Sequence, residues 1–221
     1  MKKNGFTLVE MLVVIAVLSV FGTLILVIFT RTLRGGGKTQ IITAIKQNGQ
    51  SVLEVLDKTI RNADLVACLS PTGSTLVVEQ KGIYTRYRFV PPNNTIPAIG
   101  NCGSINGSSN GCFIQDNPDT PVKRILNGRE YPDKDFINKV CADNDPMLPE
   151  AATLTDTNTQ TGVSVDCVAS NCTLNPFFLR GTAVGYKDQV TIKFDLKPAV
   201  DASKVVGQID PVTFQTTVQL R

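Results

Sequence analysis

The first part of the chain is dominated by one long apolar run. Every residue from Phe6 to Phe29 is uncharged except Glu10, and basic residues stand on both sides of the run. At about 1.5 Å per residue, a helix of this length covers roughly 36 Å, against about 30 Å of hydrocarbon in a bilayer. A secretory signal peptide has a shorter apolar region, of about 7–15 residues, and ends at a small-residue cleavage site that this run lacks. The pattern therefore predicts a membrane-spanning helix.

A second helical pattern follows in residues 38–66, where one apolar stripe faces lysines and acids on the opposite side. The stripe comprises Ile41, Ile45, Val52, Val55 or Leu56, Ile60, Ala63 and Val66. It predicts an amphipathic helix, weakened at Asn48-Gly49, that packs on a sheet; binding of a lipid or a partner helix is the less favoured interpretation. Residues 31–37 contain three consecutive glycines, each costing about 1 kcal/mol relative to alanine in a helix. They predict a Gly-rich hinge that interrupts the helix.

The remaining patterns are those of strands. Residues 74–80 and 83–90 flank Lys81-Gly82, a two-residue hairpin signal. Further strands are expected at 162–168, 174–180, 189–196 and 213–220. Residues 91–161, rich in Gly, Asn, Pro, Asp and Thr, predict one long inserted loop with a short helix at 134–140. The fold class is therefore α+β, with a long N-terminal transmembrane and amphipathic helix followed by an antiparallel sheet.

Six cysteines lie beyond the apolar run, at Cys68, Cys102, Cys112, Cys141, Cys167 and Cys172. Their spacing fits neither zinc ribbons nor CxxC redox motifs. Three disulfides are expected, with Cys102–Cys112 and Cys167–Cys172 as local pairs and Cys68–Cys141 by elimination. Bridges require an oxidising compartment, whereas six buried thiols in a cytosolic protein are the alternative. Because the flanking lysines and arginines favour neither side, the cysteines place the N-terminus in the cytoplasm and residues 38–221 outside.

Candidate chemistry is sparse. The chain has no histidine, which excludes His-based nucleophile pairs and His zinc ligands. Asp143-Asn144-Asp145 lacks the glycine and glutamate of an EF-hand and is interpreted as a turn. We therefore expect no enzyme activity, no metal and no cofactor. Arg86 and Arg88 share one face of a strand with interleaved aromatic residues, which suits single-stranded nucleic acid. A solvated strand face is the favoured interpretation, since a net charge of +3 is too slight to argue for nucleic acid.

Glu10 alone would be interpreted as a side chain that reaches the lipid headgroups. Its setting changes this: a short basic leader ends in Gly5, and the string Gly5-Phe6-Thr7-Leu8-Val9-Glu10 precedes the apolar run. This string resembles the type IV pilin and type II secretion pseudopilin family. The resemblance implies a leader at residues 1–5, cleavage by a prepilin peptidase between Gly5 and Phe6, and N-methylation of Phe6. It makes residues 6–30 the filament-core helix.

The resemblance also implies a role for Glu10. Cleavage creates a cationic α-amine on Phe6, and in a core of packed apolar helices this amine can neutralise Glu10 of a neighbouring subunit. The layout of elements is similar to a minor, J- or W-type subunit. The implied partners are the prepilin peptidase, other pilin subunits and the cytoplasmic membrane. The chain would be a single-pass membrane protein and then part of a surface pilus or a periplasmic pseudopilus. A tip adhesin or DNA-uptake receptor, using residues 91–161 or the Arg86 and Arg88 face, is the alternative; salt-dependent DNA retention would separate the two.

Overall fold

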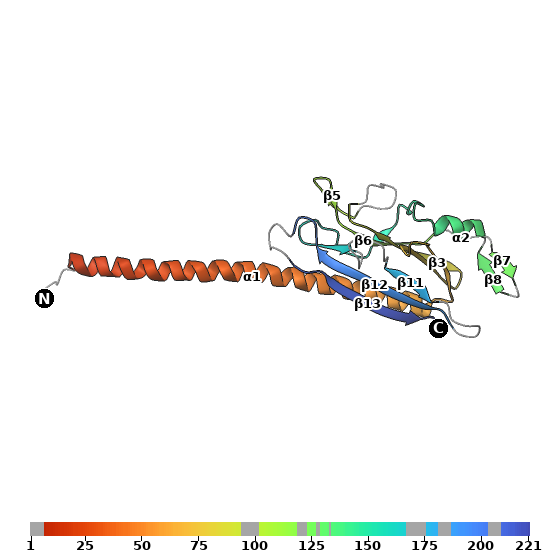
Figure 1. Ribbon diagram of the computed structural model, residues 1–221, viewed down its shortest axis with the longest axis horizontal. Helices are drawn as coiled ribbons and strands as arrows, with labels where there is room; N and C mark the ends of the chain where they lie inside the picture. Colours follow the sequence, from red (N-terminus) through yellow and green to blue (C-terminus); the bar gives the residue numbers. More distant parts are fainter. Residues whose placement is uncertain are drawn as a thin grey trace. The chain divides into compact units, whose positions relative to one another are not determined.

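The computed structural model describes residues 7–93, 102–118, 123–126, 129–132, 134–166, 176–180, 187–202 and 209–221. The chain divides into two compact units, Met1–Gln40 and Ile41–Arg221. Helix α1 covers Leu8–Asn62 and α2 covers Lys134–Val140 (Figure 1). The strands are β1 Leu65–Leu69, β2 Thr75–Gln80, β3 Ile83–Val90, β4 Ser104–Ile105, β5 Ser108–Ser109, β6 Cys112–Asp116, β7 Lys123–Leu126, β8 Arg129–Pro132, β9 Ala152–Thr153, β10 Val163–Asp166, β11 Phe177–Arg180, β12 Gln189–Pro198 and β13 Val212–Gln219. The predicted α+β class is confirmed, with every strand pair antiparallel.

The triple glycine does not interrupt the helix. Gly35, Gly36 and Gly37 are all helical within α1, so the predicted break in secondary structure is wrong. Each glycine weakens a helix by about 1 kcal/mol, but propagation adds one hydrogen bond per residue once both flanks are helical. The boundary between the two compact units lies a few residues further on, after Gln40.

The second part of α1 forms the predicted amphipathic helix. Ile45, Val52, Leu56 and Ile60 are all fully buried in the main core. The helix ends at Asn62, earlier than the predicted 66, because Leu65 and Val66 pair with β2 as part of β1. A sheet partner for Val66 outweighs its place in the predicted helical stripe.

Asn48-Gly49, where the helix was predicted to be weakened, lies inside the continuous helix α1. A Cβ atom on Gly49 would lie 2.2 Å from Cζ of Phe214, so only glycine lets this ring approach the helix. The Asn48 side chain donates to the Ala44 carbonyl and accepts the backbone N–H of Asp156 at 2.8 Å. The pair is therefore a docking point between α1, β13 and the loop that follows β9.

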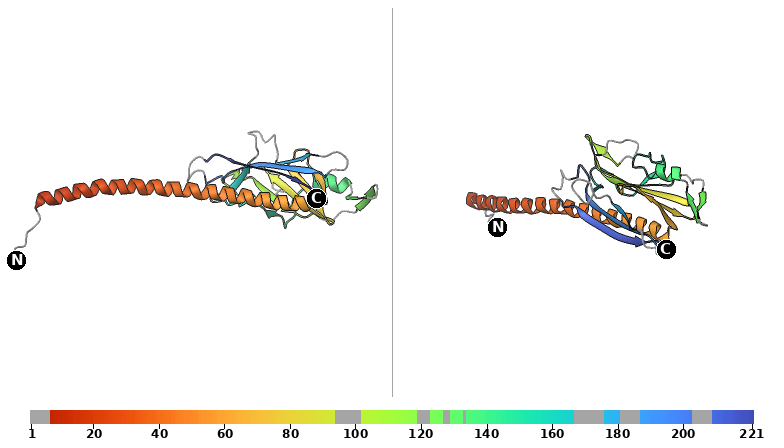
Figure 2. Two further views of the ribbon diagram at one scale, coloured as in Figure 1. Left: turned by 90° about the horizontal axis from the view of Figure 1, so that it is seen from below. Right: turned by 45° about the vertical axis from the view of Figure 1, so that its right-hand side comes forward.

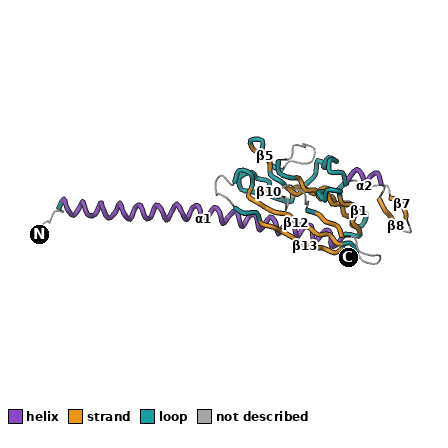
Figure 3. Tube along the Cα trace, viewed as in Figure 1, coloured by secondary structure: helices purple, strands orange, loops and turns teal. Residues whose placement is uncertain are grey.

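Two sheets pack around the C-terminal part of α1 within the second unit (Figures 2 and 3). One has the strand order β1-β2-β3-β6-β9, and the other has β10-β12-β11 with β13 on β12. Both contribute to the main core, for example through Phe113 and Phe194, whose ring centroids lie 4.9 Å apart. The β2–β3 hairpin is confirmed, and its turn residues Lys81 and Gly82 have φ angles of 52° and 82°, as a type I′ turn requires.

Residues 91–161 are not one long loop. They supply β6, which pairs with β3 inside the five-stranded sheet, together with the edge strand β9 and two small hairpins. The helix expected at 134–140 is confirmed as α2. The prediction missed β6 because a five-residue strand among turn-forming residues carries too little periodicity to stand out. The strands predicted at 162–168, 174–180, 189–196 and 213–220 correspond to β10, β11, β12 and β13 over their described residues.

Candidate functional site

Helix α1 begins with a reciprocal pair of hydrogen bonds. The Thr7 hydroxyl accepts the backbone N–H of Glu10 at 3.3 Å, and Oε2 of Glu10 accepts the backbone N–H of Thr7 at 3.2 Å. The same Oε2 atom also accepts the Thr7 hydroxyl at 3.3 Å. This is a capping box, which satisfies N–H groups that the first turn leaves without a helical partner. Glu10 therefore has a role inside its own chain, and its Oε1 atom has no hydrogen bond to the described residues.

The surface of α1 beyond Glu10 is apolar and unburied. Its large side chains between Leu8 and Phe29 are 45–78% exposed. Among the described residues, α1 is the one helix long and apolar enough to cross a membrane, and none of its most apolar stretch is buried. Gly5 and Phe6, the predicted cleavage and methylation positions, lie outside the described residues.

Arg86 and Arg88 are not available to nucleic acid. Both are 1% exposed, so the predicted nucleic-acid face and the favoured solvated face are both wrong. Arg86 donates to both carboxylate oxygens of Asp116, at 2.8 Å and 2.5 Å, and to Asp145 at 2.5 Å. Burial opposes the charge, but these two carboxylates raise the pKa of Arg86 above its usual value. The predicted alternation along β3 is correct, since Tyr87 and Phe89 point into the main core.

The second arginine is held by one hydroxyl group and two backbone carbonyls. Arg88 donates to the Thr75 hydroxyl at 3.0 Å, to the Ala142 carbonyl at 2.9 Å and to the Asp145 carbonyl. Burial, and then the charge of Arg86, lower the pKa of Arg88 to about 10. It stays cationic at neutral pH. The two arginines thus fix the segment after α2 on the outer face of the five-stranded sheet.

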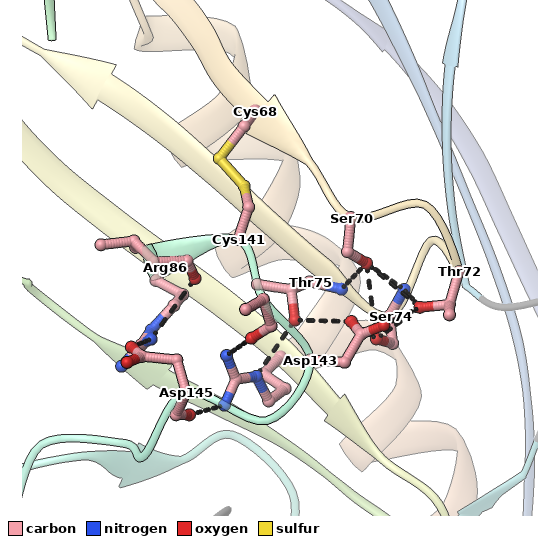
Figure 4. Close-up of a disulfide and its surroundings, with 12 residues drawn as sticks. Cys68, Ser70, Thr72, Ser74, Thr75, Arg86, Cys141, Asp143 and Asp145 are labelled. Atoms are coloured by element: carbon pink, nitrogen blue, oxygen red, sulfur yellow. Dashed lines mark hydrogen bonds and ion pairs between the residues drawn. A yellow bond between two sulfur atoms is a disulfide. The ribbon is translucent and has the colours of Figure 1, made fainter. Parts of the chain in front are cut away.

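Asp143 is the first residue of Asp143-Asn144-Asp145, the sequence that lacks the glycine and glutamate of an EF-hand. Its carboxylate accepts hydrogen bonds from hydroxyl groups. Figure 4 shows its carboxylate directed at the turn before β2, where Ser74 and Thr72 donate to it at 2.5 Å and 2.7 Å. Burial alone would raise its pKa, but hydrogen bonds from that turn and the charge of Arg88 lower the pKa below its usual value. The described residues contain no group of three or more His, Cys, Asp or Glu able to hold a metal ion.

Two disulfides staple the second unit. Cys68 in β1 is bonded to Cys141 after α2, and Cys102 is bonded to Cys112 in β6 (Figure 4 shows the first). Both pairings are those that the sequence led us to expect. Cys167 and Cys172 lie outside the described residues, so their pairing stays a prediction. Each bridge anchors a part of residues 91–161 to the five-stranded sheet.

The comparison with known families falls on the N-terminal helix. Residues 1–26 match the prokaryotic N-terminal methylation motif. The match includes Gly5, Phe6 and Glu10 and supports a type IV pilin-like family, whose members are processed subunits that assemble with one another. No curated protein and no solved structure matches the chain.

Sequence reasoning missed two features of these sites. The Thr-x-x-Glu spacing of Thr7 and Glu10 is itself a capping-box signal at the start of an apolar run, and it was available in the sequence. The acidic partners of Arg86 carried no such signal, because Asp116 and Asp145 lie 30 and 59 residues further along the chain. Only the sheet register, which pairs Arg86 with Asp116 across β3 and β6, brings the first pair together.

Proposed function

We propose that the chain is a minor structural subunit of a type IV pilus or a type II secretion pseudopilus. A prepilin peptidase cuts it between Gly5 and Phe6 and methylates Phe6. The observation that carries the proposal is the apolar surface of α1 from Leu8 to Phe29, which its own chain leaves uncovered. An apolar surface of this size needs either lipid or other apolar helices around it. Before assembly the lipid is the cytoplasmic membrane, with the N-terminus in the cytoplasm; in a filament it is replaced by neighbouring subunits.

Glu10 has a divided role in this proposal. Its Oε2 atom caps its own helix through Thr7, which leaves Oε1 for the α-amine of Phe6 in a neighbouring subunit. A carboxylate and an amine that are each costly among apolar helices become tolerable as a hydrogen-bonded pair. The pair would set the register between subunits. The three glycines after the apolar run remain a candidate hinge, now proposed as a helical segment that bends easily.

The mature N-terminus tests the processing step. We expect the protein extracted from membranes to begin at Phe6 and to carry one N-methyl group, because the cleavage site follows Gly5. Intact mass measures both changes at once. A control from cells without prepilin peptidase should retain Met1–Gly5. A chain that still carries Met1 where the peptidase is active would contradict the proposal.

The Glu10→Leu variant tests assembly. Loss of one partner of a buried charge pair costs about 3–5 kcal/mol, so we expect at least about a hundredfold less of this variant in sheared filaments. Cleavage and membrane insertion should be normal, since the cut depends on the leader. Ser19→Leu is the matched control: it removes a polar group whose hydroxyl bonds only the carbonyls of Ile15 and Ala16 in its own helix. Equal incorporation of both variants would refute the inter-subunit pair.

The alternative function is that of a tip adhesin or DNA-uptake receptor. Arg86 and Arg88 cannot form its binding face, because both are buried. It now relies on residues 91–161 alone. Salt-dependent retention of the purified chain on DNA would revive it, because phosphate contacts weaken steeply as salt rises.

A further inference from the structure

Within the described residues, the sheet of β10 to β13 has a long edge at β13 with no further strand beside it. Strand β13 pairs with β12 along its whole length, from Val212 opposite Leu196 to Gln219 opposite Gln189. It pairs with no other strand in the part of the chain that the structure describes. Figure 1 shows it at the margin of its sheet. The N–H and C=O groups along such a margin form a template for one more strand.

The devices that protect sheet edges are absent from β13. Proteins protect their edges with bulges, short strands, charged residues or proline. In the other sheet, edge strand β1 has an irregular register between Val66 and Cys68, and edge strand β9 has two residues. By contrast, β13 is eight residues long, has an unbroken register and contains neither a charged residue nor a proline. Such an edge is suited to pairing.

The ends of the strand indicate which partner fits. Asp210 stands just before β13 and Arg221 just after it, and both are exposed. A second β13 laid antiparallel brings Asp210 of each copy near Arg221 of the other, whereas a parallel copy would bring like charges together. We propose that β13 pairs with β13 of a second copy of this chain, about a two-fold axis, so that one sheet runs through both copies. Such an interface presents the same patch on both sides.

Alternation along the strand limits the register. Phe214 and Val218 face the core, whereas Gln215, Thr217 and Gln219 are exposed on the opposite face. Residues paired across two antiparallel strands point to the same face. The two-fold axis must therefore lie midway between one residue and the same residue of the other copy. The axes that pair most of the strand are those at Gln215 and at Thr216. The first sets Gln215 opposite its own copy, and the second sets Gln215 opposite Thr217.

This contact goes beyond the proposed function, because it joins the second units rather than the apolar helices. It can be tested without filaments, in membranes of cells that lack prepilin peptidase, where the full chain stays uncut. A failed test there leaves the proposed filament role untouched. Conversely, a subunit that never enters filaments would still form this pair.

The test is disulfide cross-linking of full-length cysteine variants under mild oxidation. With the axis at Gln215, the two Cβ atoms of Gln215→Cys lie about 4.5–5.5 Å apart, near the range that a disulfide spans. With the axis at Thr216, the double variant Gln215→Cys with Thr217→Cys cross-links instead. Gln219→Cys is the control on the same exposed face, since its two copies are roughly 20–27 Å apart in either register. We expect at least about tenfold more dimer from Gln215→Cys or from the double variant than from the control.

A charge exchange in the cross-linking variant provides the second arm. Asp210→Arg places like charges near each other at both ends of the paired strands and should lower the dimer yield several-fold. Adding Arg221→Asp restores opposite charges and should restore the yield. Equal dimer from all cysteine variants, or no dimer above the Gln219→Cys level, would overturn the proposal. So would a charge exchange that fails to restore a lowered yield.

Discussion

Glu10 and Arg86 differ in whether the sequence indicates their hydrogen-bond partners. Glu10 sits in a run of apolar residues, so its need for a partner is visible in the sequence, and Thr7 provides part of the answer three residues away. Arg86 looks like an ordinary surface arginine in a strand, yet its side chain is 1% exposed and bonded to two carboxylates. For Arg86 the charge persists because hydrogen bonds to these carboxylates replace the water that burial removes.

The ion pair of Arg86 should matter far more than its exposed counterpart. Asp116→Asn leaves an arginine buried with one carboxylate fewer, and we expect a loss of about 3–5 kcal/mol in the free energy of unfolding. Asp57→Asn is the control: it removes the partner of Arg61, a side chain 49% exposed, and should cost less than about 1 kcal/mol. Denaturant unfolding of the chain in detergent, followed by tyrosine fluorescence, measures both. Similar losses in the two variants would show that the Asp116 pair contributes little.

Two glycines in helix α1 have opposite effects on stability. A Cβ atom on Gly36 would meet nothing within 4 Å apart from its own stretch of helix, so its presence only weakens α1. Gly49 lies against Phe214, which stacks on Phe194 with centroids 5.6 Å apart and therefore cannot move freely. A helix propensity scale assigns both positions the same cost.

Alanine substitutions at the two positions should therefore change stability in opposite directions. Gly36→Ala should raise the stability of the helix by about 0.5–1 kcal/mol, because alanine restricts the unfolded chain. Gly49→Ala should lower the free energy of unfolding of the second unit by about 1–3 kcal/mol, because the new methyl group displaces the Phe214 ring. Thermal unfolding by circular dichroism at aromatic and peptide wavelengths measures the two effects. A stabilising Gly49→Ala would mean that the ring yields without cost.

At the scale of the whole molecule, the second unit depends on connections between segments that are distant in the chain. The Cys68–Cys141 bridge joins residues 73 positions apart. The same segment after α2 is held by Arg86, Arg88 and the hydroxyl groups that donate to Asp143. A cross-link over a loop of this length contributes roughly 2–4 kcal/mol.

Thiol labelling checks these cross-links together with the remaining pair. We expect almost no adducts on the denatured, unreduced chain, since two bridges are present and Cys167–Cys172 is predicted as a third. After reduction, the six cysteines of the chain should all react. Several free thiols before reduction would contradict the third bridge and point to a reducing compartment.

Features that depend on neighbours along the chain can be predicted from the amino-acid sequence alone. The apolar run, the stripe of Ile45, Val52, Leu56 and Ile60, the hairpin at Lys81-Gly82 and the Thr7–Glu10 cap all act over a few residues, so a local pattern encodes them. The two described disulfides also followed from counting and spacing.

Which surfaces pack against one another follows from the three-dimensional fold and not from any local pattern. It buried Arg86 against Asp116, placed β6 inside a sheet, ended α1 at Asn62 in favour of β1, and fitted Gly49 to Phe214. Each outcome rests on a contact between residues far apart in sequence, and the free energy of burial and hydrogen bonding at that contact exceeds the local preference of about 1 kcal/mol that a sequence pattern reflects. A local pattern cannot reveal which distant residue provides that contact.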